Sequence, residues 1–457
     1  MPTTFDAIVI GTGQAGPSLA GRLAAAGQKV AVIERKFFGG TCVNTGCTPT
    51  KTLIASAAAA HTARRAADYG IRVEGGVSTD MRRVKARVDA ISHKSRDNVE
   101  SWLRGMANCT VFQGTAQFAA AHTVRVGQEE LQADRIFINV GARATVPPFP
   151  GLDQVRTLTN TTILELEEVP RHLVVIGGSY VGLEFAQAFR RFGAEVTVVE
   201  KAPRLIGRED AEISDSVTKV LQNEDIDVRC DAECISFEPR GADIAVTVGC
   251  TSGPPEVVGS HVLIAVGRRP NTDDLGLERA GVATDDRGFI RVDDELRTSV
   301  PHIWAMGDCN GRGAFTHTSY NDYEIVAANL LDGQSRKVSD RVPGYALYID
   351  PPLGRAGMSE AEARAKGHQV RIGSRPMTRV PRAVEKGETQ GLMKLVVDAA
   401  TGAILGAAVL GPGGDEAIHG ILDLMTARAP ATTLQRAVPI HPTVSELLPT
   451  LVSELKP

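Results

Sequence analysis

The chain lacks any uninterrupted apolar run approaching the roughly 18 residues that a membrane-spanning helix needs. It also lacks an excess of charge of either sign, because 50 basic and 54 acidic residues leave a net charge of −4. A nucleic acid or an anionic membrane surface selects for a strongly basic face. We therefore expect a cytoplasmic protein with neither a membrane nor a nucleic acid as partner.

Cysteine is scarce, with seven residues in a chain of 457. An odd number in a chain of this size argues against the disulfide framework of a small secreted domain. Cys230 and Cys234 are close in sequence, but no histidine or further cysteine follows at the spacing of zinc ligands. The sequence therefore predicts no metal site, and the remaining close pair, Cys42 and Cys47, needs a different explanation.

The chain is longer than one hydrophobic core usually covers, so we expect roughly two to four domains. Its 46 glycines and 43% hydrophobic residues are typical of an α/β enzyme with many tight turns. Continuous apolar stretches predict buried strands at residues 135–140, 261–266 and 303–306. Helices are predicted at residues 69–98 and 317–331, and an antiparallel α+β unit is predicted beyond Pro351.

An internal repeat gives the clearest indication of fold. The apolar stretch 5–10 precedes Gly11, Gly13 and Gly16, and the stretch 173–176 precedes Gly177, Ser179 and Gly182, which lie 166 positions later. The same offset relates three further pairs: Ala20 and Ala186, Gly27 and Gly193, and Glu34 and Glu200. The first glycine permits a tight turn, and the third permits close packing of helix on strand. The chain therefore has two nucleotide-binding βαβ units.

Each unit should hold one dinucleotide, with a pyrophosphate at the helix N-terminus and a ribose on Glu34 or Glu200. We expect one flavin and one nicotinamide. A carboxylate at Glu200 favours the free 2′-hydroxyl of NADH, whereas Lys201, Arg204 and Arg208 leave NADPH as an alternative. Ser179 stands where the middle glycine of the second copy is usual, so the approach of phosphate is less free there.

Cys42 and Cys47 lie in the segment GGTCVNTGCTPTK, residues 39–51, directly after the first unit. A thiol pair beside a flavin can relay two electrons to a substrate disulfide, which requires a thiolate and an acid for the leaving thiol. His441 in the segment HPTVSE supplies that acid, and Glu446 would fix its tautomer. Buried structural thiols and a core histidine are the alternative interpretations.

These motifs resemble the class I pyridine nucleotide-disulfide oxidoreductases, which include dihydrolipoamide dehydrogenase, glutathione reductase and mercuric reductase. The resemblance covers essentially the whole chain. It implies an FAD domain formed by residues 1–147 and 268–338, an NAD(P) domain formed by residues 148–267, and an interface domain formed by residues 339–457. It also implies a homodimer in which His441 completes the active site of the partner chain.

The resemblance assigns roles by position. Cys42 resembles the interchange thiol and Cys47 the charge-transfer thiol at the start of a helix. Lys51 resembles the lysine at the flavin ring edge, paired with Glu184, and Tyr180 resembles the gate over the nicotinamide pocket. Further expected cofactor-binding residues are Gly40, Thr41, Gly141, Gly267, Gly307 and Asp308, the last of these at the ribityl chain of the flavin.

The substrate stays open among three hypotheses. The first is a flavin-dependent disulfide reductase of unassigned substrate. The second is dihydrolipoamide dehydrogenase itself, although Pro439 stands where that enzyme usually has a second histidine. The third is a mercuric or soft-metal-ion reductase, although no cysteine follows Cys309 to form the C-terminal pair of mercuric reductases.

Overall fold

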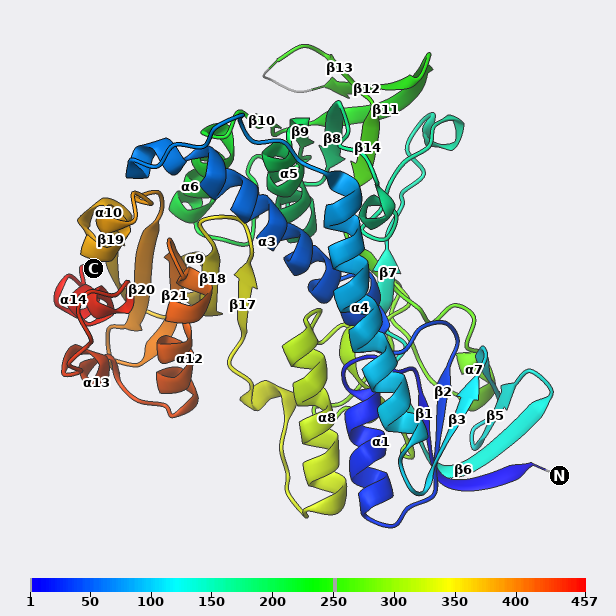
Figure 1. Cartoon of the computed structure of the whole chain (residues 1–457). Helices are drawn as coiled ribbons and strands as arrows, with labels where there is room; N and C mark the ends of the chain where they lie inside the picture. The colour runs from blue at the N-terminus through cyan, green and yellow to red at the C-terminus, as the bar shows by residue number, and fades with distance from the viewer. Residues whose placement is uncertain (1, 250–252) are drawn as a thin grey trace. The chain divides into compact units, whose positions relative to one another are not determined.

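A computed structural model describes residues 2–249 and 253–457, as Figure 1 shows in cartoon form. The side chain of Cys234 lies outside the described part, so the interpretation of Cys230 and Cys234 stays a prediction. The chain forms two compact units: one comprises Met1–Thr52, Arg83–Thr145 and Gly267–Arg341, and the other comprises Leu53–Arg82, Val146–Val266 and Val342–Pro457. None of the described helices is long and apolar enough to span a membrane.

The first unit is built on a seven-stranded sheet. Its parallel part has the order β3-β2-β1-β6-β16. β5 pairs antiparallel with the start of β6, and β4 pairs antiparallel with β5. The strands are β1 Thr3–Ile10, β2 Val30–Glu34, β3 Cys109–Gln113, β4 Ala116–Ala120, β5 Thr123–Val126, β6 Glu129–Ile138 and β16 Ile303–Ala305. A separate ribbon joins β7 Ala142–Ala144 to β15 Arg268–Pro270.

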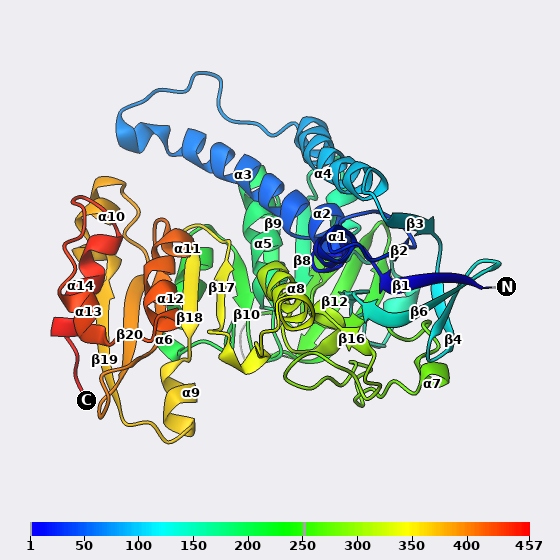
Figure 2. The same cartoon turned by 90° about the horizontal axis from the view of Figure 1, so that it is seen from below.

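Helices α1 (Gly16–Ala25) and α8 (Thr316–Leu331) lie side by side on one face of this sheet, as both cartoon views show (Figures 1 and 2). Leu19 and Leu23 of α1 and Ile325 of α8 join the buried cluster that contains Val9 and Val32 of the strands. The other helices that begin in or enter this unit are α2 Gly40–Asn44, α3 Cys47–Arg64, α4 Met81–Arg104 and α7 Leu277–Ala280.

The second unit contains a parallel sheet of order β10-β9-β8-β14, which repeats the arrangement β3-β2-β1-β6 of the first. Its elements are β8 His172–Ile176, α5 Tyr180–Phe192, β9 Glu195–Val199, α6 Ala211–Gln222, β10 Asp227–Arg229 and β14 His261–Ile264. A three-stranded antiparallel meander follows β10, with β11 Glu233–Arg240, β12 Asp243–Gly249 and β13 Glu256–Gly259.

The same unit ends in a five-stranded antiparallel sheet of order β17-β18-β21-β20-β19. Its strands are β17 Gly344–Leu347, β18 Leu353–Gly357, β19 Val370–Pro376, β20 Leu392–Asp398 and β21 Ile404–Leu410. Its helices are α9 Glu360–Ala365, α10 Pro381–Glu385, α11 Gly414–Ala417, α12 His419–Thr426, α13 Ala431–Gln435 and α14 Leu448–Ser453. Ile421 and Leu451 of the helices pack with Leu395 and Val409 of the strands in one core.

The predicted fold class is confirmed: two nucleotide-binding α/β sheets precede a C-terminal α+β unit. One predicted helix is wrong in its first part, because residues 70–80 are not helical and the helix begins at Met81. Gly70, Gly75 and Gly76 adopt positive φ angles, which glycine adopts readily and which end the helical path. The predicted boundaries of the three domains stay a prediction.

Candidate active site

The first fingerprint forms a turn in which side chains are sterically excluded. A Cβ atom on Gly16 would lie 2.2 Å from the carbonyl oxygen of Gly11, and one on Gly13 would lie 2.8 Å from Asn139 Oδ1. The Asn139 side chain accepts a hydrogen bond from Gly16 N at 3.0 Å and donates one to Met306 O at 2.9 Å. Asn139 therefore joins the start of α1 to the end of β16.

Two more glycines approach this turn. A Cβ atom on Gly40 would lie 2.9 Å from Gly13 Cα, and one on Gly307 would lie 3.0 Å from Asn139 Nδ2. Their φ angles of +62° and +74° also favour glycine. Backbone without side chains, from three separate segments, therefore surrounds one helix N-terminus. This arrangement fits the diphosphate of a flavin dinucleotide.

The two predicted ribose acceptors are held in the same way. Glu34 accepts hydrogen bonds from the backbone N–H groups of Thr12 at 3.1 Å and Lys36 at 2.8 Å. Glu200 accepts them from Gly178 at 2.5 Å and Ala202 at 2.7 Å. The donors and the acceptor of the first unit thus correspond to those of the second at the same offset of 166 positions. The two units therefore form equivalent hydrogen bonds in three dimensions.

The second fingerprint has the same steric constraint as the first, although a serine replaces its middle glycine. A Cβ atom on Gly182 would lie 2.2 Å from Gly177 O, the same distance as for the corresponding pair in the first unit. Ser179 has φ −114° and ψ −176°, an extended conformation that any residue adopts. The serine therefore causes no backbone strain at the start of α5.

Cys47 is the first residue of α3, as predicted, and Cys42 lies on α2. Cys47 is exposed, Cys42 is half-buried, and neither forms a disulfide. The hydrogen bond with Cys47 and burial raise the pKa of the Cys42 thiol far above its ordinary value. Cys42 therefore keeps its proton while Cys47 receives a hydrogen bond, the arrangement in which Cys47 bears the thiolate.

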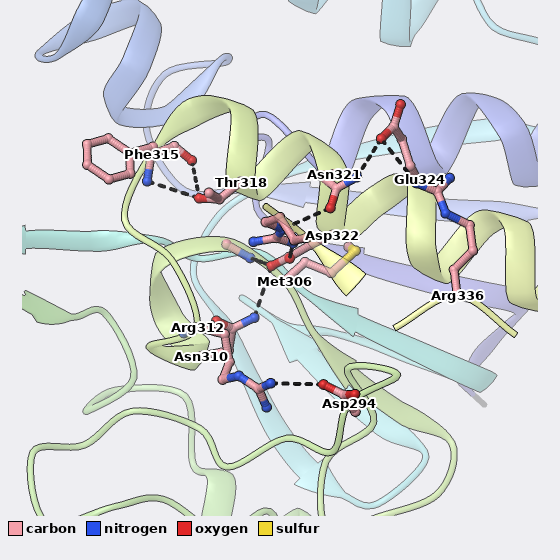
Figure 3. A network of polar contacts seen from close by, with 12 residues as sticks. Asp294, Met306, Asn310, Arg312, Phe315, Thr318, Asn321, Asp322, Glu324 and Arg336 are labelled. Carbon is pink, nitrogen blue, oxygen red and sulfur yellow. Dashed lines mark hydrogen bonds and ion pairs between the residues drawn. The ribbon is translucent and has the colours of Figure 1, made fainter. Parts of the chain in front are cut away.

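Thr316 is a neighbour of the cysteine pair that the sequence did not predict. Its Oγ1 lies 3.2 Å from Cys47 Sγ. Thr316 is the first residue of α8, and the Thr318 hydroxyl fixes this helix start by bonding the N–H and C=O of Phe315 (Figure 3). The N-termini of α3 and α8 thus meet at one sulfur atom, where their dipoles favour a thiolate.

Asp322 on α8 fixes the turn that follows β16 (Figure 3). Its Oδ2 accepts hydrogen bonds from Gly307 N at 2.8 Å and Asn310 Nδ2 at 3.1 Å. Asp308 lies in this turn, 3.6 Å from Arg268 Nε. Burial raises the pKa of Asp308 above its ordinary value, and the positive charge of Arg268 opposes that rise.

His441 and Glu446 form the predicted pair in the second unit. His441 Nδ1 lies 2.9 Å from Glu446 Oε2, with side-chain exposures of 73% and 7%. The buried carboxylate fixes the ring, so that Nε2 is presented to solvent. Among residues 2–249 and 253–457 no group of three His, Cys, Asp or Glu side chains is placed to hold a metal ion.

The remaining predicted residues lie as follows. Glu184 on α5 accepts a hydrogen bond from Tyr348 N at 3.0 Å, and Tyr180 begins that helix. Lys51 lies on α3 in the first unit, so its pairing with Glu184 of the second unit stays a prediction. Thr41 lies on α2, and Gly141 and Gly267 have φ angles of +65° and +125° before β7 and β15.

Asn139, Thr316 and Arg268 are site residues that sequence reasoning missed. Asn139 had a signal, since it is a polar residue inside the apolar stretch 135–140. Thr316 and Arg268 had none, because each reaches its partner from a distant segment.

Comparison with known proteins agrees with this geometry. The family model described as pyridine nucleotide-disulphide oxidoreductase matches residues 5–322, and the model of that family's dimerisation domain matches residues 343–452. A probable pyridine nucleotide-disulfide oxidoreductase of Escherichia coli, RclA, is 36% identical over 461 residues, with 99% of each chain covered. A mercuric reductase of Streptomyces lividans is 35% identical, covering 98% of this chain and 95% of the relative.

A dihydrolipoyl dehydrogenase of Thermus scotoductus is 34% identical, covering 97% of this chain and 95% of the relative. The solved structure of the HOCl-induced flavoprotein disulfide reductase RclA from E. coli has a TM-score of 0.88 at 35% identity, covering 98% of this chain and 99% of that one. The chain therefore belongs to the pyridine nucleotide-disulphide oxidoreductase family, as a flavoprotein disulfide reductase with a dimerisation domain.

Proposed function

We propose that the chain passes two electrons from NADH through FAD to the Cys42–Cys47 pair, and from this pair to a small disulfide. The observation that carries the proposal is the position of Cys47 at two helix N-termini with Thr316 Oγ1 at 3.2 Å. When bound, the flavin supplies two-electron transfer between nicotinamide and a disulfide.

The first unit would hold FAD through its glycine turn, where Glu34 would bind the adenosine ribose and Asp308 the ribityl chain. The second unit would hold NADH through Gly177 and Gly182, with Glu200 on the ribose and Tyr180 over the nicotinamide. Both oxygens of Glu200 already accept backbone hydrogen bonds, so its negative charge is fixed where a 2′-phosphate would lie. This charge favours NADH over NADPH.

The reduced pair would act by thiol–disulfide exchange. Cys42 passes its proton to His441 as its sulfur attacks one sulfur of the substrate disulfide, and His441 then gives this proton to the thiol that leaves. Cys47 then displaces the second substrate thiol from Cys42, which restores the Cys42–Cys47 disulfide and balances two electrons. Lys51 and Glu184 would stabilise charge at the flavin edge.

The first test is an anaerobic titration of the flavin-bound protein with NADH. A long-wavelength absorbance band at two-electron reduction is expected, because a thiolate then lies against oxidised flavin. Cys47→Ser should abolish this band and lower disulfide reductase activity by a factor of about 10³ or more, while FAD stays bound. Cys109 is a half-buried cysteine on β3, and the control variant Cys109→Ser should keep both the absorbance band and the activity. Bleaching of wild-type flavin without the band would contradict the relay.

The same titrated protein distinguishes the disulfide substrates. Turnover of dihydrolipoamide with NAD at about 1–10³ s⁻¹ would identify a dihydrolipoamide dehydrogenase. Turnover well below that range, with faster reduction of another disulfide, would identify a reductase of a different small substrate.

A second candidate is the reduction of a thiol-binding metal ion. A solved structure of E. coli RclA is titled as a Cu(II) complex, with a TM-score of 0.89 and 35% identity to this chain. A dithiol can bind a soft metal ion, and metal reduction needs no proton for a leaving thiol. NADH oxidation that is stimulated by Cu(II) or Hg(II) and survives His441→Ala would favour this candidate. Loss of the stimulation in His441→Ala would favour disulfide exchange.

A further inference from the structure

We propose that Asp322 is a positioning residue for the flavin, because it fixes the turn 307–310 in which Asp308 would bind the ribityl chain. The inference rests on the proposed function, since it takes Asp308 to be the ribityl acceptor. All of the residues that carry it belong to the first unit.

Asp322 is a buried carboxylate on α8, with 2% of its side chain exposed. Its Oδ2 accepts hydrogen bonds from Gly307 N at 2.8 Å and Asn310 Nδ2 at 3.1 Å. Its Oδ1 accepts a hydrogen bond from Arg341 Nη2. One oxygen atom therefore holds the turn, whereas the other compensates the buried charge through an arginine.

Asn310 extends these bonds along the turn (Figure 3). Its Nδ2 also donates to Ala305 O at 3.0 Å, and its Oδ1 accepts from Arg312 N at 2.8 Å. Asp308 lies between Gly307 and Asn310 in the chain, and both of these residues are bonded to Asp322. The bonds to Asp322 therefore fix the backbone on both sides of Asp308.

A turn that is ordered before its ligand binds increases affinity, because binding then loses less conformational entropy. Gly307 has φ +74°, and a glycine has many other conformations available when no bond restrains it. Without the bonds to Asp322, binding of FAD would have to order the turn as well. Asp322 thus acts on the affinity for FAD through Asp308.

An asparagine in place of Asp322 cannot satisfy the three donors. A carboxylate accepts on both oxygens, whereas an amide has one oxygen and an NH₂ group that is itself a donor. The guanidinium of Arg341 forms the stronger, charge-assisted hydrogen bond, so the amide oxygen should face it. The NH₂ group then faces Gly307 N, and the turn loses its acceptor while the size of the side chain stays the same.

The dissociation constant of FAD tests this inference, measured from the fluorescence of FAD released when the flavin-bound protein is diluted. Asp322→Asn should raise this Kd about tenfold. Arg341→Gln leaves both bonds to the turn in place, so it should lower the Tm and leave the Kd for FAD unchanged. Asp332→Asn is the matched control, because it alters an exposed carboxylate at the end of α8 that pairs with Arg22, and it should leave the Kd for FAD unchanged.

Equal Kd values for wild type and Asp322→Asn would overturn the inference. An equal rise in Arg341→Gln would also overturn it, because FAD affinity would then follow the stability of the fold. Asn310→Ala serves if Asp322→Asn does not fold, since it removes a turn bond to Asp322 and keeps the pair with Arg341. It should raise the Kd for FAD to a similar degree, and an unchanged Kd would count equally against the inference.

A variant of Asp308 shows whether Asp322 acts through it. The double variant Asp308→Asn/Asp322→Asn should raise the Kd for FAD by less than the product of the two single effects. The full product would show that the two carboxylates act independently, which would overturn the inference. Wild-type affinity in Asp308→Asn alone would instead contradict the role of Asp308 in the proposed function, and with it the basis of the inference.

Discussion

At the residue scale, the Thr316 hydroxyl contacts the sulfur atom of Cys47. It lies 3.2 Å from Cys47 Sγ and can donate a hydrogen bond to a thiolate there. Thr316→Val keeps the shape of the side chain and removes the donor. We expect the pH midpoint of the long-wavelength band to rise by roughly one unit, because a hydrogen bond to a charged group contributes about 1.5 kcal/mol.

The midpoint is measured by pH titration of the two-electron-reduced protein. Thr318→Val is unsuitable as a control, since Thr318 fixes the start of α8. Thr62→Val is suitable, because the Thr62 hydroxyl donates its hydrogen bond to Ala58 O of the same helix, α3. A midpoint that stays the same in Thr316→Val would show that the two helix dipoles suffice to stabilise the thiolate.

At the element scale, we expect a substitution in the first βαβ unit to impair flavin binding and one in the second to impair reduction by NADH. An alanine at Gly16 or Gly182 would place Cβ 2.2 Å from a carbonyl oxygen, which must push helix and strand apart at a cost of about 1–3 kcal/mol. Gly16→Ala should be purified with little flavin. Gly182→Ala should keep its flavin, seen by absorbance, and lose reduction by NADH. Gly420→Ala on α12, where a Cβ meets nothing within 4 Å, should behave as wild type.

The elements around these glycines were predictable because their signals are local. A strand, a glycine turn, a helix and a closing glutamate recur within about 30 residues in each unit, and α3 begins at Cys47 as the motif indicates. Thr316 and Arg268 were not predictable, because each acts through a contact between distant segments. The helix predicted at residues 69–98 begins too early, because charged residues in this stretch favour a helix whereas the glycines at 70, 75 and 76 interrupt it.

At the scale of the whole molecule, the His441 segment bears features of a surface that another chain covers. Val438 and Ile440 are 94% and 78% exposed, beside a histidine whose carboxylate partner is buried. Isolated exposed apolar residues are common, but two of them next to the proposed acid His441 are costly to leave in water. The family's dimerisation domain spans this segment. A twofold dimer would cover these residues on both chains.

If His441 of one chain serves the cysteine pair of its partner, two inactive variants should complement each other. Cys47→Ser and His441→Ala each lack one half of every site in their homodimers. Random mixing by co-expression makes about half of the dimers mixed, each with one complete site, so activity should return to about a quarter of wild type. Differently tagged chains allow mixed dimers to be purified and assayed at about half of wild-type activity. Mixed dimers with no activity above that of the single variants would place both groups of the site on one chain, because each chain would then contain one defect in its only site.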